Sequence, residues 1–398
     1  MKPKKDNVTY INDFNKKINK KKLIIAGILG AIILIWLICF IIYAFNAQFR
    51  MFCDIYIFRK EIEENNATQV KISDINVSNV FAFSNYIAVI KDNVMTKYNS
   101  AGNEESTLKI EITKPLIDTN GNYAAIAEKL GQKIYLVKNN EIVWENTLSG
   151  NISTVDVNEN GYVSVILSGT SYKSVIILYD ENGNELFKTY LSNTIAISSE
   201  ISSDNKYLSF AEVNTSGTLI QSNIKIISIE KAKQMPADAV IYTYKANENS
   251  LVTNIEYHKN RLVCMYEDSI QEIENNENKE VTLLKENDKK ITFADINLFD
   301  TALKIVENNE GLFNTKTEVQ LINTSSLKSS VYNVEGAVKS VNCYGNRISI
   351  NLGAEVHFID SNGWLIKKYV STQEIRGIAM NNKIAGIIYK NKIDIINL

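Results

Sequence analysis

The pattern of apolar and polar positions divides the chain into two unequal parts. Residues Leu23 to Phe45 form an apolar run without a charged residue, long enough as a helix to cross the roughly 30 Å hydrocarbon core of a bilayer. From about Thr68 to the C-terminus, short runs rich in Val, Ile, Tyr and Thr alternate with polar turns, and the hydrophobic period becomes two. The pattern therefore predicts one transmembrane helix followed by an all-β region.

The predicted strands recur as a repeated unit. Second strands that begin after a turn residue return at intervals near 40 residues, as in Gly161-Tyr-Val-Ser-Val-Ile and Asn205-Lys-Tyr-Leu-Ser-Phe. Such a period with four strands per unit is typical of a β-propeller. Hairpins with Gly or Asn at the turn, where positive φ is tolerated, lie at 94–110, 133–148, 174–191 and 355–370. The predicted units are 76–112, 115–148, 152–191, 194–245, 250–285, 290–333, 337–370 and 374–397.

These units predict an eight-bladed β-propeller, with seven blades as the alternative. The eighth unit stops after three strands at Leu398, whereas Thr68–Ser73 offers one spare strand before the first unit. If the eighth unit borrowed this strand, the ring would close without an open sheet edge. An open solenoid or two sandwiches would not explain one missing strand at one end and one spare strand at the other.

The segment between the apolar run and the repeats has a helical pattern. Phe49, Phe52, Tyr56 and the pair Arg59–Glu63 recur at helical spacing, and no Pro or Gly interrupts them. We expect a continuation of the helix, or an interfacial helix, that acts as a stalk. The expected domains are a basic tail (1–22), a transmembrane helix (23–45), a juxtamembrane stalk (46–66) and the propeller (67–398).

The charge distribution predicts the orientation in the membrane. Residues 1–22 hold eight Lys and two Asp, a net charge of +6, and the whole chain carries −2, so the remainder carries −8. Lysines stay on the cytoplasmic side, so we expect a cytoplasmic N-terminus and an extracytoplasmic propeller at the cell membrane. A cleaved signal peptide would have a shorter apolar core and small residues at its cleavage site. The acidic propeller disfavours nucleic acid as a partner, and the Lys-rich tail suits lipid headgroups.

Two kinds of resemblance accompany these patterns. The turn Ser202-Ser-Asp-Asn-Lys-Tyr-Leu208 is similar to a turn of WD40-like and TolB-like propellers, and the Gly turns between third and fourth strands resemble the quinoprotein-type repeat. The layout of a Lys-rich tail, one span, a stalk and a degenerate propeller resembles the DUF5711 family of membrane-anchored proteins. This resemblance covers nearly the full chain. It implies a place at the membrane and a fold, and it implies no known activity.

The sequence offers few groups for catalysis or metal binding. His258 and His357 are expected on separate blades, so neither a zinc site nor a His-dependent nucleophile is predicted. The Asp-x-Asn-Gly stretches at Asp118, Asp180 and Asp360 fit hairpin turns better than calcium loops. Cys264 and Cys343 are either a single disulfide bridge or two buried thiols. We expect no cofactor and no enzymatic activity.

The leading hypothesis is a binding or scaffold module for an envelope protein or glycan; the oligomeric state stays open. The alternative is a propeller enzyme that uses the central channel, either quinone-dependent or glycan-active. Carboxylates that converge from several first strands would favour the alternative, and the first strands considered supply only Asp156 and Glu256. Long loops between second and third strands favour a binding face. The predicted binding residues are Tyr172, Thr218, Leu312 and Phe313.

Overall fold

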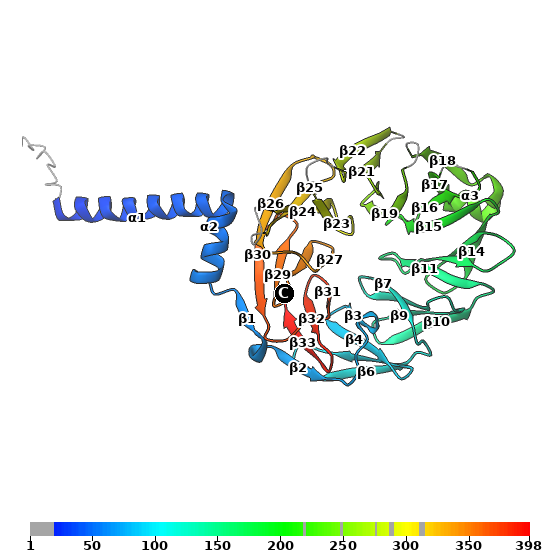
Figure 1. The fold of residues 1–398 in the computed structure, drawn as a ribbon, viewed down its shortest axis with the longest axis horizontal. Coiled ribbons are helices and arrows are strands. Elements are labelled where there is room, and N and C mark those ends of the chain that lie inside the picture. Colours follow the sequence, from blue (N-terminus) through cyan, green and yellow to red (C-terminus); the bar gives the residue numbers. More distant parts are fainter. Residues whose placement is uncertain (1–19, 218–219, 247–249, 275–276, 286–289, 310–314) are drawn as a thin grey trace, which may run out of the picture.

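The computed structural model describes residues 20–398 apart from five short loops, at 218–219, 247–249, 275–276, 286–289 and 310–314. Across these described residues the strands form eight sheets, arranged as blades around a central channel (Figure 1). Neighbouring strands are antiparallel in every blade, apart from one short parallel strand described below. The eight-bladed prediction is confirmed, and the predicted units coincide with the blades.

The N-terminal helices lie outside the ring. Helix α1 (Lys20–Phe45) contains a segment, Ile24–Phe45, that is long and apolar enough to cross a membrane and is a candidate anchor. Asn46 caps the next helix, α2 (Ala47–Phe52), by accepting a hydrogen bond from the Phe49 amide. A π-helical turn, η1 (Cys53–Ile57), follows. The predicted helical pattern thus extends to Ile57 but changes direction after α1 (Figure 1).

Each of the first four blades uses four consecutive strands. A helix, α3 (Ile229–Gln234), and a 3₁₀ turn, η4 (Pro236–Asp238), are inserted before the last strand of blade four. The strands of blades one and two are β3 (Val80–Phe83), β4 (Tyr86–Lys91), β5 (Val94–Tyr98), β6 (Glu104–Lys109), β7 (Pro115–Asn120), β8 (Tyr123–Glu128), β9 (Lys133–Lys138) and β10 (Glu141–Thr147). Those of blades three and four are β11 (Asn151–Val157), β12 (Val163–Ser168), β13 (Ser174–Tyr179), β14 (Glu185–Leu191), β15 (Thr194–Ile201), β16 (Tyr207–Asn214), β17 (Gln221–Ser228) and β18 (Val240–Lys245).

Blades five to seven repeat this order, and blade eight has only three strands from the C-terminal end. The strands of blades five and six are β19 (Val252–His258), β20 (Arg261–Tyr266), β21 (Ser269–Glu274), β22 (Glu277–Leu283), β23 (Lys290–Asp295), β24 (Thr301–Asn309), β25 (Thr315–Asn323) and β26 (Ser329–Glu335). Those of blades seven and eight are β27 (Ser340–Tyr344), β28 (Arg347–Asn351), β29 (Glu355–Asp360), β30 (Leu365–Val370), β31 (Gly377–Met380), β32 (Ile384–Ile388) and β33 (Lys392–Asn397).

The segment before the first blade closes the ring. Strand β2 (Thr68–Lys71) pairs antiparallel with β33 and completes blade eight, as the strand count predicts. Strand β1 (Glu61–Glu63) adds a parallel fifth strand to blade seven, beside β30. Residues 61–63 were expected in the helical stalk, and the structure differs there. They form a strand that is hydrogen-bonded to the edge of blade seven. A 3₁₀ turn, η2 (Glu64–Asn66), joins the two strands, and another, η3 (Val77–Asn79), precedes blade one.

The core lies between adjacent blades, because the middle strands of each blade are apolar on both faces. Strand β13 is buried along its whole length. Turn glycines allow aromatic rings of one blade to pack on the next. Gly161 and Gly183 have φ of +84° and +83°, and a Cβ there would lie 2.6 Å from Tyr123 and 2.7 Å from Trp144, respectively. These two glycines therefore serve both the turn conformation and the contact between blades two and three.

Candidate functional site

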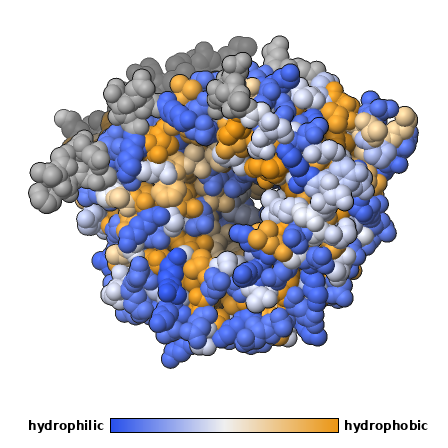
Figure 2. Space-filling view, turned by 45° about the vertical axis from the view of Figure 1, so that its right-hand side comes forward, coloured by the Kyte–Doolittle hydropathy of each residue, from blue (hydrophilic) through white to orange (hydrophobic). Residues whose placement is uncertain are grey.

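The centre of the ring holds a cavity of about 1200 Å³, to which all eight blades contribute. Its walls are formed mainly by the first strands of the blades and by the residues that follow them. Figure 2 shows an opening at the centre of one face of the ring. A cavity of this size on the propeller axis is the natural candidate site in such a fold.

Carboxyl groups gather on one side of this cavity. Asp118, Asp156, Glu200 and Glu256 line it and come from the first strands of blades two, three, four and five. Asp295, at the end of the first strand of blade six, is electrostatically coupled to Glu256. We call these five residues the acid arc. Each lies within the last three residues of its strand, so the arc is closer to the face that carries the loops between first and second strands.

A repeated backbone irregularity directs these side chains toward the cavity. The first strands of blades three to six each have a register shift within their first five residues, whereas the first strand of blade two, which carries Asp118, has none. In β19 the shift lies between Val252 and Asn254, and the buried apolar positions change from Val252 to Ile255. Asn254 and Glu256 then occupy the alternate positions and line the cavity. A β-bulge commonly re-aims side chains in this way next to functional sites.

Burial raises the pKa of every carboxyl in the acid arc. Desolvation raises the pKa of Asp118 to about 6, against the effect of hydrogen bonds from backbone amides, including Val157 at 2.7 Å. Desolvation, with the charges of Asp118 and Asp295, raises the pKa of Glu256 to about 8. Desolvation also raises the pKa values of Asp156 and Glu200 well above their ordinary range, and these two side chains are hydrogen-bonded to each other. At neutral pH, Asp118 is therefore mostly ionised, while Glu256 mostly retains its proton.

Polar groups around the arc have unused hydrogen-bonding capacity. Among the described residues, Asp156 Oδ2 and Thr154 Oγ1 are inaccessible to solvent and lack a hydrogen-bond partner, and both residues line the cavity. Tyr344 of blade seven reaches across to blade two, where its hydroxyl donates to the Thr119 carbonyl at 3.5 Å. Asp156 Oδ2 and Thr154 Oγ1 are covered in this structure, so a ligand with N–H donors would reach them only after a local shift of the cavity wall.

The expectation that few carboxylates line the channel is wrong. It considered the first strands of blades one, three, five, seven and eight, and it omitted Asp118, Glu200 and Asp295 on the remaining three. A signal for them is present in the sequence: an acidic residue falls within the last three positions of five successive first strands. Only the fold shows that these positions share one cavity.

The binding residues predicted from loop length are only partly described. Tyr172 lies in the loop between β12 and β13, is 40% exposed and packs on Tyr190 with ring centroids 4.7 Å apart. Thr218, Leu312 and Phe313 lie outside the described residues. The loop of Tyr172 follows a second strand, which runs antiparallel to the first, so it lies on the opposite face from the acid arc. We call this opposite side the loop face.

The histidines and cysteines have local structural partners. His258 is buried, with Nε2 2.7 Å from the Ile296 carbonyl oxygen and Nδ1 3.1 Å from Thr324 Oγ1. His357 contacts the Tyr332 hydroxyl at 3.0 Å on another blade interface. Cys264 and Cys343 are free thiols, so the disulfide alternative is not realised. No group of three or more His, Cys, Asp or Glu side chains suited to a metal ion occurs in the described part of the chain.

The Asp-x-Asn-Gly stretches serve hairpin turns in two cases and the cavity in the third. Asp180 Oδ1 accepts hydrogen bonds from the amides of Asn182 and Asn184, both at 2.9 Å. Asp360 accepts equivalent bonds from Asn362 and Trp364. Asp118 differs, because its side chain binds the Val157 amide of the next blade and lines the cavity.

Comparisons with known proteins agree with this fold. The C-terminal WD40 domain of Sif2 has a TM-score of 0.55 and 13% identity, with 83% of this chain and 97% of that chain covered. BamB from Moraxella catarrhalis has a TM-score of 0.49 and 12% identity, over 83% of this chain and 98% of that one. No curated protein matches the chain. A family model, described as "Family of unknown function (DUF5711)", matches residues 59–398. This match covers most of the chain, which therefore belongs to the DUF5711 family.

Proposed function

We propose that the protein is a single-pass membrane protein whose extracytoplasmic propeller is a non-enzymatic binding module of the cell envelope. In this proposal α1 is an uncleaved anchor with a cytoplasmic N-terminus, and the Lys-rich tail contacts anionic lipid headgroups. The central cavity is the ligand site. The ligand is a segment of an envelope protein that carries Lys or Arg.

The observation that carries this proposal is the convergence of the acid arc on one cavity, where burial raises the pKa of each of its carboxyls. Lys259 is on the cavity wall, and a guanidinium or ammonium group that enters the cavity adds further positive charge beside the carboxyls. Its N–H groups can also donate to carboxyl oxygens of residues that line the cavity, such as Glu200 and Glu256. Binding then displaces protons from side chains such as Glu256, whose pKa burial has raised to about 8. The affinity should consequently increase with pH.

Calorimetry on the full chain in nanodiscs of zwitterionic lipid tests this proposal. The probe is hexa-arginine amide, titrated at pH 6 and pH 8 in pairs of buffers with different ionisation enthalpies. We expect tighter binding at pH 8 and a heat that depends on the buffer, because protons leave the protein. The double variant Glu200→Gln, Glu256→Gln should bind about tenfold more weakly, a loss of about 1.4 kcal/mol.

The matched control is Glu63→Gln, which removes an exposed carboxylate from β1 on the outer edge of blade seven. Its affinity for the probe should equal that of the unaltered chain. Equal affinity of the cavity variant and the control would place binding elsewhere and contradict the proposal. Equal affinity at the two pH values, with no buffer dependence, would also contradict it.

A second candidate function is supported by the same carboxyls. Asp118 is mostly ionised at neutral pH and Glu256 mostly protonated, because burial raises their pKa values to about 6 and about 8. Two carboxyls in opposite protonation states are what glycoside hydrolysis uses. If the full chain released new reducing ends from envelope glycan, and Glu256→Gln did not, the protein would be a glycan-active enzyme. Failure of the unaltered chain to release reducing ends would leave the binding module as the better account.

The loop face stays our proposed second contact for the partner. The exposed pair Tyr172–Tyr190 offers two aromatic rings in tilted contact, a frequent composition of binding surfaces. Thr218, Leu312 and Phe313 are predicted to complete this surface. Tyr172→Ser, or Leu312→Ser with Phe313→Ser, should reduce capture of a cross-linked partner without loss of thermal stability. Undiminished capture would remove the loop face from the proposal.

A further inference from the structure

The end of α1 and the short helical segment after it expose an unusual set of large apolar side chains. Phe45, Phe52, Tyr56, Ile57 and Phe58 are all exposed, Phe45 to 88% and Tyr56 to 70%. Phe52 and Tyr56 lie against each other, with ring centroids 5.1 Å apart. We call these five side chains the elbow surface. Large side chains of this kind are rarely gathered on a water-exposed segment without a function.

The opposite side of the same segment is fixed to the propeller. Arg50 is buried, with its guanidinium 4.8 Å from the ring centroid of Trp364 on blade seven. Asp54 is fully buried, accepts a hydrogen bond from the Tyr43 hydroxyl at 2.6 Å and pairs with Lys60 at 2.9 Å. Lys60 also donates to the Leu365 carbonyl at 3.1 Å. The polar side chains on the opposite side of the segment therefore fix the position of the elbow surface relative to blade seven.

Ring contacts extend this attachment into the end of α1. Tyr43 lies edge-on to Trp364, with centroids 5.7 Å apart, and edge-on to Phe58 at 6.0 Å. A direction for α1 relative to the ring follows from these contacts. In Figure 1, α1 leaves the ring close to its plane, whereas α2 runs crosswise to α1 along the outside of blades six and seven.

We infer that the elbow surface lies in the headgroup region of the bilayer that α1 crosses. This inference rests on the proposed role of α1 as a membrane anchor. A segment that follows directly on a span and runs crosswise to it lies along the membrane surface. Tyr56 has the polar edge that favours an aromatic side chain at that depth, and a helical segment with one apolar face, here mostly Phe, can lie in the interface. The occupant of the elbow surface is thus the lipid itself.

This placement sets the orientation of the propeller. With α1 across the bilayer and the elbow surface in the interface, blades six and seven face the membrane and the ring stands on its edge (Figure 1). The channel axis then runs along the membrane plane. Both the loop face and the opposite face are then accessible to neighbouring membrane-bound proteins, at a fixed distance from the bilayer surface.

Depth-dependent quenching measures this arrangement on the full chain in phosphatidylcholine vesicles. An environment-sensitive fluorophore is attached at Phe52→Cys or Tyr56→Cys, in a background with Cys39→Ser and Cys343→Ser. Cys53 and Cys264 are buried and stay in place. Lipids with a nitroxide close to the headgroup serve as quenchers. The matched control is Leu130→Cys, which labels an exposed position on a loop of blade two.

We expect labels at positions 52 and 56 to be quenched several-fold more strongly than the label at position 130. The native Cys39, kept in a separate sample with Cys343→Ser, reports on the span itself. If Cys39 is quenched by nitroxides deep in the bilayer while positions 52 and 56 resemble position 130, the elbow inference fails and the anchor stands. If Cys39 is not quenched, the anchor itself fails. Self-quenching at positions 52 and 56 that disappears on dilution with unlabelled protein would assign the surface to a second copy and overturn the inference.

Discussion

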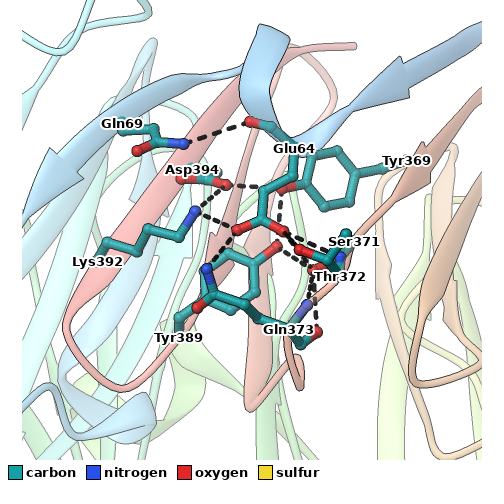
Figure 3. A network of polar contacts seen from close by, with 9 residues as sticks. All are labelled: Glu64, Gln69, Tyr369, Ser371, Thr372, Gln373, Tyr389, Lys392 and Asp394. Carbon is teal, nitrogen blue, oxygen red and sulfur yellow. Dashed lines mark hydrogen bonds and ion pairs between the residues drawn. The ribbon is translucent and has the colours of Figure 1, made fainter.

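Glu64 and Lys392 lie 328 positions apart in the sequence and form an ion pair in which Oε1 and Nζ are 2.5 Å apart. Glu64 Oε2 accepts hydrogen bonds from the amide and the hydroxyl of Thr372, at 3.0 and 2.9 Å (Figure 3). Gln373 donates to the other oxygen at 2.7 Å. The Glu64 side chain thus joins the segment that contains β1 and β2 to blades seven and eight, where the ring closes.

The first prediction concerns this carboxylate. Glu64→Gln should lower the free energy of unfolding by about 2 kcal/mol, because it breaks a mostly buried ion pair. The loss is no larger because Lys392 keeps its second ion pair, with Asp394 at 3.0 Å. Urea denaturation of the full chain in detergent measures the change. The exposed neighbour supplies the control, since Glu63→Gln should change stability by less than about 0.5 kcal/mol. A Glu64 variant as stable as this control would show that the closure does not depend on the pair.

The same network predicts a loss of stability in acid. Burial alone would raise the pKa of Glu64, but hydrogen bonds from Lys392 and Thr372 and the charge of Lys392 lower it from 4.5 to about 2. A carboxyl whose pKa is lower in the folded state stabilises the fold above its unfolded pKa, and this contribution is lost as pH falls. The stability difference between the unaltered chain and Glu64→Gln should therefore shrink between pH 4.5 and pH 2. A difference that stayed constant over this range would contradict the assignment.

The third prediction concerns the borrowed strand. Deletion of residues 61–73 removes β1 and β2, which leaves β33 as an open edge. Hydrogen exchange in the peptide 390–398 should become faster, and the melting temperature should fall, because Val70 and the Glu64 network are lost together. Exchange in β13 of blade three serves as an internal reference and should change least. Unaltered protection of β33 would mean that β2 is not part of the closure.

The sequence was sufficient for the architecture because its signals are local and repeated. An apolar run of helical length, a period of two and turn residues near every 40 positions identify the elements. The strand count then predicts the pairing of Thr68–Lys71 with the last blade, which the structure confirms. The short strand β1 could not be predicted in this way. Its three residues, Glu61-Ile-Glu63, alternate polar and apolar but are too few to establish a period of two. They are extended because they pair with β30 and pack Ile62 against blade eight.

The site was harder to predict for a geometric reason. In β15 and β23 a bulge changes which alternate positions face the channel, so a simple period of two does not identify Glu200 or Asp295 as members of the acid arc. The members of the acid arc are also 38 to 56 positions apart in the sequence, and no local motif links them. Their convergence results from the ring itself.

The fourth prediction concerns membrane topology. The native Cys264 is buried and desolvation raises the pKa of the Cys343 thiol, so neither is a good reporter. Leu130→Cys, with Cys39→Ser and Cys343→Ser, offers an exposed thiol on the propeller. A membrane-impermeant maleimide should label it in intact cells, because the Lys-rich segment keeps the N-terminus inside. Asn7→Cys in the same background should be labelled only after lysis. The reverse pattern would invert the orientation.

The last prediction concerns the effect of pH on the acid arc. Desolvation, together with the charges of Asp118 and Asp295, raises the pKa of Glu256 from 4.5 to about 8. Between these two values the folded protein binds a proton that the unfolded chain has lost, so stability must fall as pH rises through this range. One such group changes the free energy of unfolding by at most about 1.4 kcal/mol per pH unit, and water in the channel reduces this effect. Glu256→Gln should therefore be more stable than the unaltered chain at pH 8, with a smaller difference at pH 5.

Urea denaturation at pH 5, 6.5 and 8 measures this difference in stability, with Glu63→Gln as the control that should follow the unaltered chain. A Glu256→Gln variant that is less stable at pH 8 would show that the carboxylate is ionised and stabilised by a positive charge in the folded protein, and that the channel is not a site of retained protons.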